Sequence, residues 1–404
     1  MTLKEEFEIL RGEPIEEYFG DPMDIPCNET SDSARLCRNP VVSVKMCTYN
    51  HEPFIRRAIE GVMMQRTDFE FELVIGEDAS TDRTREICFE YQRRYPERIR
   101  VLWSERNVTI GLRHPAGGNS ARTRAHCRGE FIAVCEGDDY WIDPCKLQKQ
   151  VDILRSHPNV GWCFCSARID ENGVDNGLVW SDYSVWIPGL VSSGEFMMKY
   201  IFGVWPSLPS KWPTATFLIN ATIMYRRAIR QKALQTFDCL RWRLFLGDTP
   251  SWLAYSCLSD AYYLPDAVAV YNRNSGGVTS VKGGKVWRDS VLSRLWFFNR
   301  YYGLSFSKLP MRMVFNVYSA LTTGHGLSDG RRLARTILDM SRRCQKLREM
   351  FLRPALLPLY PALMIFGAGE KYHAVLHIYR KYFLRGDQPP FWIKEEMTKY
   401  GGET

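Results

Sequence analysis

One stretch of the sequence constrains the fold more than any other: an apolar run that begins at Phe131 and ends in three carboxylates, at Glu136, Asp138 and Asp139. The run has the length and apolar content of a strand covered on both faces, as in the parallel sheets of α/β proteins. Ligands of open α/β sheets bind at the carboxyl ends of the strands. The acids therefore stand where such a protein would bind a ligand, and Gly137 between them lets the backbone approach it closely.

The three carboxylates indicate a bound cation. Adjacent anions repel one another, so they must take up protons or share a positive ion. Ligands that are all oxygen favour a hard ion such as Mg²⁺ or Mn²⁺, and we expect Asp138 and Asp139 to bind it. The alternative is a solvated acidic turn in which Asp139 or Asp143 caps the next helix. We regard it as weaker because the acids close a hydrophobic strand and the aromatic pair Tyr140–Trp141 follows directly.

Strand-like and helix-like segments alternate four times in the first part of the chain. Amphipathic helices, the second of them capped by Ser80 or Thr81, separate four expected strands at 41–46, 71–75, 99–103 and from 131 onward. This alternation is typical of an α/β fold, a Rossmann-like and mainly parallel sheet with helices on both faces.

The usual glycine-rich phosphate loops are missing from this pattern. Neither G-x-G-x-x-G nor G-x-x-x-x-G-K-[ST] follows any of the expected strands. A nucleotide would therefore be held by other groups. Asp78 at a strand end can accept a hydrogen bond from a base N–H, Thr48 and Tyr49 can flank a base or ribose, and a metal at Asp138 can take the phosphates.

Three motifs resemble family 2 of the GT-A glycosyltransferases in their order and spacing. They are Thr48–Asn50 after the first strand, Glu77–Asp82 after the second, and Glu136–Trp141 after the fourth. The resemblance covers roughly residues 41–282 and implies a GT-A nucleotide-sugar-binding fold. By it, Thr48, Tyr49 and Asp78 would hold the base and ribose of the donor.

The resemblance also implies a metal and donor site. Glu136-x-Asp138 takes the family's D-x-D position, with Glu where Asp is commoner, and Asp138 would be the metal ligand. Many relatives have His where this chain has Asn274, and Arg273 could substitute for it. The candidate donor-binding residues are Thr48, Tyr49, Asn50, Glu52, Asp78, Glu136, Gly137, Asp138 and Arg273.

The following part of the chain is expected to bind the acceptor. A strand at 216–225 and a helix from Arg226 precede an apolar run that ends at Asp248. The resemblance implies that Asp248 is the general base, whereas the alternative is a plain helix N-cap. A group of aromatic residues could be an acceptor wall that stacks sugars or aromatic core beneath loops: Trp180, Tyr183, Trp186, Trp205 and Trp212.

Charge and pattern divide the chain into four parts. We expect an N-terminal extension (1–40), a nucleotide-sugar-binding half (41–165), an acceptor-binding half (166–284) and a basic helical C-terminal region (285–404). This last region contains 20 Lys and Arg but only 9 Asp and Glu, although the whole chain carries +7. Together with a short apolar segment broken by prolines, this asymmetry predicts contact with an anionic membrane surface.

The setting expected from the sequence is a reducing one. The twelve cysteines lie in apolar runs, Cys163 and Cys165 share one strand face without a second pair at zinc spacing, and the first residues do not resemble a signal peptide. We therefore expect buried structural thiols and a cytoplasmic protein, peripheral at the inner face of the membrane. The chain lacks the aromatic and basic strand signature of nucleic-acid binding.

Taken together, the sequence predicts a metal-dependent inverting glycosyltransferase. Its donor would be a nucleoside diphosphate sugar, most simply a UDP-sugar, and its acceptor a hydroxyl of a glycan or lipid-linked glycan. A sugar nucleotidyltransferase is one alternative, but its glycine-rich loop should stand where Thr48–His51 lie. The other is a non-catalytic membrane-associated nucleotide-sugar-binding protein, which would not need all the acids that are present at strand and loop ends.

Overall fold

The structure is a computed structural model that describes residues 14–109, 117–179, 186–193, 218–244 and 248–277, and a few single residues outside them. The chain divides into two units, one made of 1–12, 283–292 and 302–404 and the other of 13–282 and 293–301. The fold described below is that of the second unit. The basic region predicted for 285–404 falls almost wholly outside the described residues.

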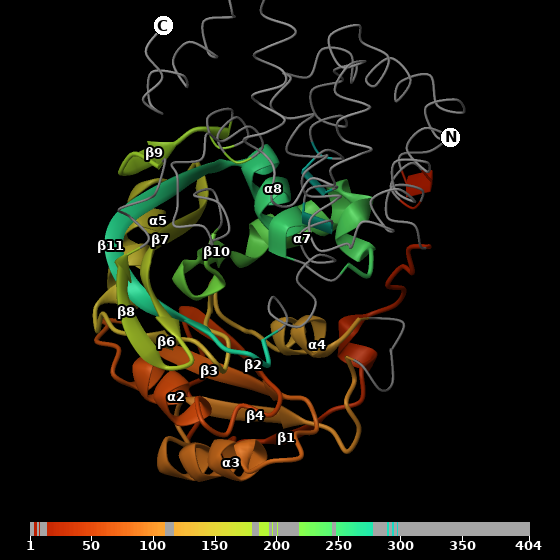
Figure 1. Ribbon diagram of the computed structural model, residues 1–404, viewed down its shortest axis with the longest axis vertical. Coiled ribbons are helices and arrows are strands. Elements are labelled where there is room, and N and C mark those ends of the chain that lie inside the picture. Colours follow the sequence, from red (N-terminus) through yellow and green to blue (C-terminus); the bar gives the residue numbers. More distant parts are fainter. Residues whose placement is uncertain are drawn as a thin grey trace, which may run out of the picture. The chain divides into compact units, whose positions relative to one another are not determined.

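One mixed sheet runs through this unit (Figure 1). Its order is β1-β4-β3-β2-β5-β10-β7-β11-β6, with β8 beside β7 and β9 beside β11. The strands are β1 (Asn28–Thr30), β2 (Val42–Thr48), β3 (Phe71–Glu77), β4 (Ile99–Trp103), β5 (Phe131–Val134), β6 (Tyr140–Trp141), β7 (Val160–Glu171), β8 (Val174–Val179), β9 (Gly189–Val191), β10 (Met224–Arg226) and β11 (Asp260–Arg273).

The first half of the sheet is parallel, as the alternating pattern predicts. β4, β3, β2 and β5 pair in parallel, so the residues that follow β2, β3 and β5 meet at one edge. The short β10 lies antiparallel between β5 and β7, and β11 returns parallel to β7. The predicted α/β fold, mainly parallel in its nucleotide half with helices on both faces, is confirmed.

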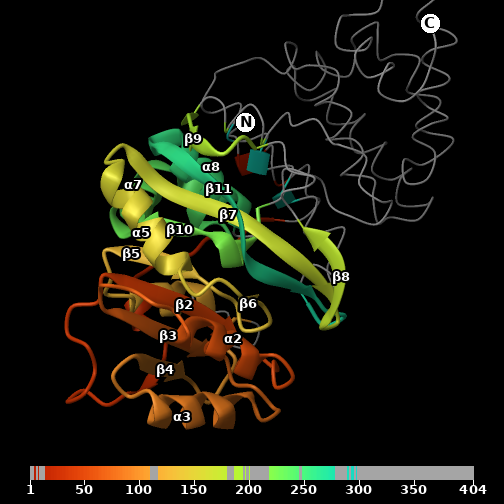
Figure 2. The same ribbon diagram turned by 90° about the vertical axis from the view of Figure 1, so that its left-hand side faces the viewer.

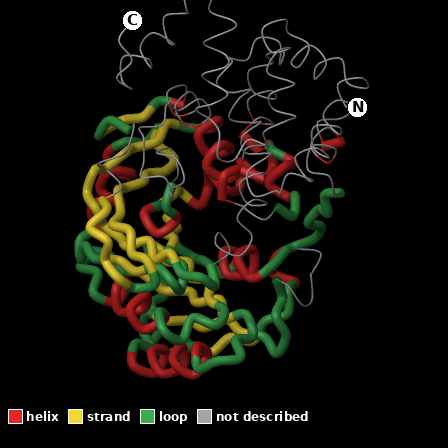
Figure 3. The backbone as a smooth tube through the Cα atoms, in the orientation of Figure 1, coloured by secondary structure: helices red, strands yellow, loops and turns green. Residues whose placement is uncertain are grey.

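Helices cover both faces of the sheet (Figures 2 and 3). The described helices are α2 (Ile55–Met63), α3 (Thr84–Arg94), α4 (Asn119–Ala125), α5 (Lys146–Ser156), α7 (Arg227–Thr236) and α8 (Asp248–Leu258). Buried apolar residues of α2, α3 and α5 join one core cluster with those of the strands. α4 packs on the opposite face, against β2 and β3.

The strand β2 shows why two faces with different chemistry arise. Val42, Val44 and Met46 belong to the apolar cluster under α2. The residues between them alternate to the other face, because successive side chains of a strand point in opposite directions. There the buried Lys45 and the thiol of Cys47 face α4, with Cys47 Sγ 3.9 Å from Thr123 Oγ1. A strand of mixed sequence thus serves both a core and a polar site.

The second half of the sheet packs a cluster of aromatic rings. Trp162 and Phe164 of β7 stack against each other, and Trp186 stacks on Phe196 with 5.1 Å between the ring centroids. Trp186 is 5% exposed, so this member of the predicted aromatic group belongs to the core. The other members, Trp180, Tyr183, Trp205 and Trp212, lie outside the described residues.

Two local predictions from the sequence are wrong. The strand expected at 216–225 is interrupted by a 3-10 helix, η3 (Asn220–Thr222), and only β10 remains. The reason is local hydrogen bonding, since the Thr222 hydroxyl donates to the carbonyl of Ile219 at 2.7 Å and closes a turn. The second error is the helix cap expected at Ser80 or Thr81.

The helix α3 begins at Thr84, three residues after the predicted cap. Ser80 and Thr81 form hydrogen bonds with Asn50 instead. Ser80 Oγ accepts from the backbone amide of Asn50, and Asn50 Oδ1 accepts from the backbone amide of Thr81. Asp82 accepts from the Thr84 amide at 3.0 Å. The loops after β2 and β3 are therefore tied together.

Seven of the eleven described cysteines are buried thiols, as predicted, whereas Cys27, Cys37, Cys47 and Cys145 are half-buried. Cys163 and Cys165 are both buried in β7 and belong to the apolar core cluster. Burial raises the pKa of Cys165 to about 12. In the described part of the chain, no helix combines the length and apolar character that crossing a membrane requires.

Candidate functional site

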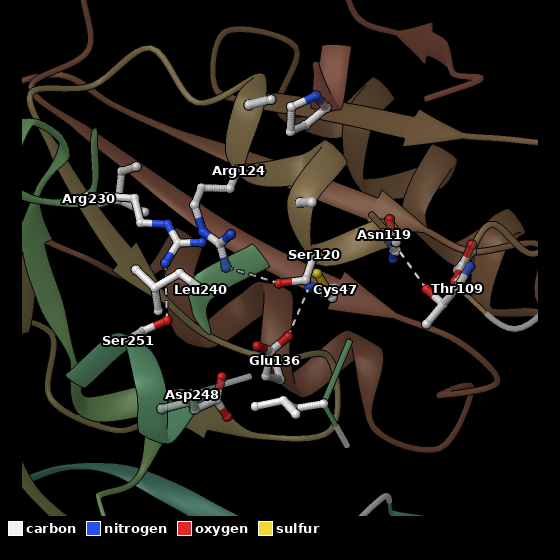
Figure 4. A pocket seen from close by; sticks show the side chains of 18 of the residues that line it. Cys47, Thr109, Asn119, Ser120, Arg124, Glu136, Arg230, Leu240, Asp248 and Ser251 are labelled. Carbon is white, nitrogen blue, oxygen red and sulfur yellow. Dashed lines mark hydrogen bonds between the residues drawn. The ribbon is translucent and has the colours of Figure 1, made fainter. Parts of the chain in front are cut away.

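A cavity of about 1090 Å³ opens at the carboxyl edge of the parallel strands. Its lining comes from the segment 18–23, the ends of β2, β3 and β5, the helices α4, α7 and α8, and the end of β11. It therefore brings together residues more than 200 positions apart in the sequence, among them Thr48, Asp138, Asp248 and Asn274. Figure 4 shows the part of the cavity around Glu136 and Asp248.

Asp138 is the acid that faces this cavity with partners from two other segments. Its Oδ2 accepts a hydrogen bond from Asn274 Nδ2 at 3.0 Å. The same oxygen lies 3.9 Å from His51 Nε2. Both side chains are about one fifth exposed, at 21% for Asp138 and 22% for His51. Asn274 thus occupies a position beside the acid.

Two polar atoms in this corner are buried and have no partner among the described residues: Thr48 Oγ1 and His51 Nδ1. Both crowd the glycine between the acids, since a Cβ on Gly137 would lie 2.8 Å from Thr48 Oγ1 and 2.9 Å from His51 Nδ1. Only glycine leaves room for this approach. Unsatisfied buried polar atoms are costly, so their presence points to a polar ligand.

Asp139 has a different environment from its neighbour. Its side chain is buried, and its Oδ1 accepts from the backbone amide of Asn272 at 3.0 Å. Burial first, and then the negative charge of Asp138, raise the pKa of Asp139 well above its usual range. A carboxyl of this kind favours the protonated form unless a cation lies close by.

The alternative role predicted for these acids was capping of the next helix. Neither acid has it, since the N-cap of α5 is Cys145 and no side chain caps the helix. Asp143 Oδ1 accepts from the backbone amide of Cys145 at 2.8 Å and closes a turn just before α5, whereas Asp139 faces β11.

Glu136 is paired with a buried lysine. Lys45 Nζ lies 3.1 Å from Glu136 Oε1, and the backbone amide of Cys47 lies 3.3 Å from Glu136 Oε2. The acid that departs from the commoner Asp of the D-x-D motif thus has its negative charge matched by Lys45. It lines the cavity between Asp138 and Asp248.

The proposed base-binding residues are only partly available in this structure. Asp78 lines the cavity, but its two carboxylate oxygens accept from the backbone amides of Val108, at 2.7 Å, and Thr109, at 3.3 Å. Each carboxylate oxygen has a second lone pair, so a further donor can still bind. Tyr49, also in the lining, is 38% exposed.

Three predicted donor-binding residues do not line the cavity, namely Asn50, Glu52 and Gly137. Asn50 Oδ1 accepts from the Thr81 amide at 2.8 Å, and Glu52 Oε2 accepts from the Arg83 amide at 3.1 Å. Both clamp the loop after β3 to the loop after β2. Arg273 does line the cavity, and its Nη1 lies 3.4 Å from Glu171 Oε1.

Asp248 is the first residue of α8 and faces the cavity from the side of α7 and α8. Its Oδ2 accepts a hydrogen bond from Asn220 Nδ2 at 2.6 Å. Burial is the main cause that raises its pKa above the usual range of Asp, and the negative charge of Glu136 adds to it. A carboxylate with a raised pKa is a stronger base than an ordinary one.

Several residues of the site were not predicted from the sequence: His51, Arg124, Asn220 and Arg230, which line the cavity, and Lys45, which pairs with Glu136. Lys45 could have been suspected, because a lysine in the middle of an apolar strand needs a partner. His51 belongs to a recognised motif. Asn220, Arg124 and Arg230 carry no local signal, since their positions follow from how η3, α4 and α7 pack.

The described residues contain no group of three or more His, Cys, Asp and Glu side chains that could enclose a metal. The donors in the corner around Asp138 are still suited to a hard or borderline divalent ion, because they are oxygens and one imidazole. The unsatisfied Thr48 Oγ1 and His51 Nδ1 and the space at Gly137 fit a bound polar group. The residues present therefore fit an ion that receives its remaining ligands from a bound diphosphate.

Comparison with known proteins agrees with this arrangement. Residues 43–232 match the model of glycosyl transferase family 2. The protein Rv1520 of Mycobacterium tuberculosis is 41% identical over 238 residues, which are 59% of this chain and 60% of that protein. Chondroitin synthase of Escherichia coli is 32% identical over 159 residues, which are 39% of this chain and 22% of the synthase.

Solved structures were compared as well. S. aureus TarS 1-349 in complex with UDP-GlcNAc aligns over 84% of this chain and 91% of that chain, with 20% identity and a TM-score of 0.46. The chain spans less than two thirds of the length of Rv1520 and of chondroitin synthase. The segment 43–232, which holds the acids at the ends of β2, β3 and β5, belongs to glycosyl transferase family 2.

Proposed function

We propose that this protein transfers a sugar from a nucleoside diphosphate donor to a hydroxyl of a glycan or lipid-linked acceptor, with inversion at the anomeric carbon. One observation carries the proposal: a single cavity joins the acidic corner of Asp138 to the raised-pKa carboxyl of Asp248. The corner around Asp138 would hold a metal ion that binds the diphosphate, and Asp248 would act as the general base. Membership of glycosyl transferase family 2 supports both assignments.

The donor would bind at the end of β2 and β5. Asp138 would hold Mg²⁺ or Mn²⁺, with His51 and Asn274 beside it and Asp139 beneath it. Such an ion neutralises the charge that develops on a leaving diphosphate. Thr48, Tyr49 and Asp78 would bind the base and ribose, and Arg273 would reach the phosphates. We propose UDP as the nucleotide, as the resemblance of the motifs at Thr48, Asp78 and Asp138 to family 2 implies.

The acceptor would bind on the side of α7 and α8. Asp248 would accept the proton of the attacking hydroxyl, and the acceptor oxygen would then form the new bond to the anomeric carbon as the diphosphate leaves. A separate acid is not required, because a nucleoside diphosphate is a better leaving group than an alcohol. The hydrogen bond from Asn220 would hold the carboxylate of Asp248 in place.

The proposal is tested by thermal stabilisation with UDP, GDP and dTDP, each with and without Mn²⁺. A ligand that binds only the folded state raises the melting temperature by mass action. We expect one nucleotide to stabilise the wild type only when Mn²⁺ is present, and Asp138→Asn to abolish this effect. Equal stabilisation with and without the metal would contradict the metal assignment, and no stabilisation by any nucleotide would contradict the donor class.

A membrane location is the remaining part of the proposal. It rests on the excess of 20 Lys and Arg over 9 Asp and Glu in 285–404. Flotation with vesicles containing anionic lipid would test it, by comparing the full chain with the same chain in which Arg331, Arg332 and Arg335 are changed to Gln. We expect the full chain to float and the variant to float less.

A further inference from the structure

Two arginines from different helices meet in the cavity beside the acceptor side. Arg124 comes from the last turn of α4, and Arg230 comes from α7. Both line the cavity together with Asp248. Figure 4 shows their guanidinium groups next to each other, above Glu136 and Asp248.

Neither guanidinium has the partners that its N–H groups need. A guanidinium carries five N–H donors. Arg124 Nη2 lies 3.2 Å from Ser120 Oγ, and Arg230 Nη1 lies 3.2 Å from Ser251 Oγ. The Nε atoms of both, like that of Arg122, are sealed from solvent and have no hydrogen-bond partner, so the difference from Arg122 lies in the terminal nitrogens. Other contacts go to uncharged phenols, Arg124 with Tyr225 and Arg230 with Tyr255.

Arg122 on the same helix shows what a structural arginine looks like in this protein. Its two terminal nitrogens donate to four oxygens at 2.8–3.1 Å, which belong to Pro26, Glu77, Ser104 and Asn119. Those bonds fasten α4 to β3 and to the N-terminal segment. Arg124 and Arg230 have no comparable set of bonds, so fastening helices does not explain them.

The electrostatics of the pair are unfavourable without a ligand. Two cations side by side repel each other, and taking a charge out of water is costly unless an opposite charge compensates it. Burial lowers the pKa of Arg230, and the positive charge of Arg124 contributes to this. Burial also acts to lower the pKa of Arg124, but the neighbouring phenols of Tyr225 and Tyr255 outweigh it and raise that pKa. In the described part of the chain, no carboxylate lies within ion-pair distance of either group.

The nearby acids do not fill this role. Glu136 is paired with Lys45, and Asp248 receives its hydrogen bond from Asn220. We propose that Arg124 and Arg230 together bind an oxyanion of the acceptor, a carboxylate or a phosphate group close to the hydroxyl that is attacked. The inference rests on the proposed function in one respect, because Asp248 defines which side of the cavity is the acceptor side.

The chemistry of the pair selects this ligand class. A planar guanidinium binds two oxygens of a carboxylate or phosphate at once, and charge-assisted bonds of this kind are about twice as strong as neutral ones. Two such groups would clamp one oxyanion and satisfy the buried Nε atoms. A neutral sugar hydroxyl would leave both charges uncompensated. The acceptor would therefore be an acidic glycan or a phosphate-bearing one.

The test measures binding of three small probes to the full chain: inorganic phosphate, D-glucuronate and neutral D-glucose. Arg124→Gln and Arg230→Gln remove one charge each, and Arg124→Lys and Arg230→Lys keep the charge but lose the planar fork. Arg83→Gln is the matched control, because Arg83 is 65% exposed and pairs with Glu86 outside the cavity. Circular dichroism and melting temperature report whether each variant folds.

We expect the wild type and Arg83→Gln to bind phosphate or glucuronate and not glucose. Each Gln variant should weaken anion binding by at least about tenfold, and each Lys variant by less, since charge-assisted bonds depend on charge and geometry. Preference for phosphate would indicate a phosphate-bearing acceptor, and preference for glucuronate an acidic sugar. If a Gln variant does not fold, anion binding by the Lys variant at the same position is compared with that of the wild type.

Three results would overturn the inference: no anion binding to the wild type, an equal loss in Arg83→Gln, or only adventitious binding that all Gln variants retain. Metal-dependent nucleotide binding is measured on the same samples. It should change by less than about twofold in the Arg variants; a tenfold loss would place the arginines at the donor and also refute the inference. Absence of nucleotide binding in the wild type would instead refute the proposed function.

Discussion

Lys45 and Glu136 form an ion pair with Nζ and Oε1 3.1 Å apart, between the middle of β2 and the segment just after β5. The lysine side chain is 4% exposed, whereas the glutamate side chain is 25% exposed. Lys45 neutralises the charge of Glu136, which is the first residue of the Glu136-x-Asp138 motif. It leaves Asp138 as the acid that would hold the proposed cation.

The first prediction concerns this pair. Removing one partner of a buried ion pair leaves the other charge uncompensated, which costs about 3–5 kcal/mol when both are fully buried. Because Glu136 is a quarter exposed, we expect Glu136→Gln to lower the free energy of unfolding by about 1–3 kcal/mol. Urea denaturation measures it.

The double variant Lys45→Met with Glu136→Gln is the control for that measurement. It removes both charges, so we expect it to be more stable than Glu136→Gln alone. Additive losses from the two single substitutions would show that the ion pair contributes nothing.

The second prediction is that Asp248→Asn removes turnover while donor affinity stays the same. The amide keeps the size of the side chain but cannot accept the proton, and general-base catalysis contributes about 10²- to 10⁴-fold. Steady-state kinetics and nucleotide binding measure the two effects separately. A variant that retains more than about a tenth of wild-type turnover would mean that the base lies elsewhere.

The third prediction follows from the raised pKa of Asp248. A base acts only when deprotonated, so turnover should fall as the pH falls through this pKa, at a pH above the usual range of Asp. The hydrogen bond from Asn220 favours the charged form and opposes the shift. Asn220→Ala should therefore move the acid limb of the pH–rate profile to higher pH. Loss of turnover at every pH, with an unmoved limb, would assign Asn220 a merely structural role.

The sequence predicted the parallel half of the sheet because its signals are local. An apolar run such as the one at Phe131 and the alternation within Val42–Thr48 reveal strands. The acids that follow β3 and β5 line one cavity, because parallel strands end at the same edge. Asn50 and Glu52 show the limit of motif reasoning, since their neighbours line the cavity but they clamp loops.

The contributions of α4 and α7 could not be predicted in this way. Arg122 and Arg124 lie two residues apart on one short helix, yet the first fastens the fold and the second faces the cavity. Their different roles follow only from the way in which α4 packs on β3. Thr222 is a similar case, because one hydroxyl bond to Ile219 replaces a predicted strand by a turn. The different roles of the two arginines depend on long-range contacts, and the turn at Thr222 depends on a single local hydrogen bond that competes with the strand.

The fourth prediction concerns the glycine in the acidic motif. A Cβ at residue 137 would lie 2.8 Å from Thr48 Oγ1 and 2.9 Å from His51 Nδ1, so both side chains would have to shift in Gly137→Ala. We expect metal-dependent nucleotide binding to weaken by at least about tenfold, which corresponds to 1.4 kcal/mol. Gly173→Ala adds a methyl group with nothing within 4 Å and tests for a general effect on folding, although its φ of +81° adds backbone strain. Unchanged affinity in Gly137→Ala would show that this corner does not touch the donor.

The last prediction concerns Lys146, which is fully buried in α5, donates to Gln150 Oε1 at 2.8 Å and lies 4.0 Å from the ring centre of Trp141. Burial lowers its pKa from 10.5 to about 8. The folded state therefore disfavours the charged form, and the free energy of unfolding should rise with pH between about 8 and 10.5, by roughly 3 kcal/mol in total.

Lys146→Met should abolish this rise in urea denaturation at stepped pH. Lys149→Met is the matched control on the same helix: Lys149 pairs with Asp143 and Asp266, its pKa is raised, and its stabilisation stays constant below pH 10.5. An unchanged slope in Lys146→Met would mean that the amine of Lys146 has the same pKa in the folded and unfolded states, and that its burial costs nothing over this range.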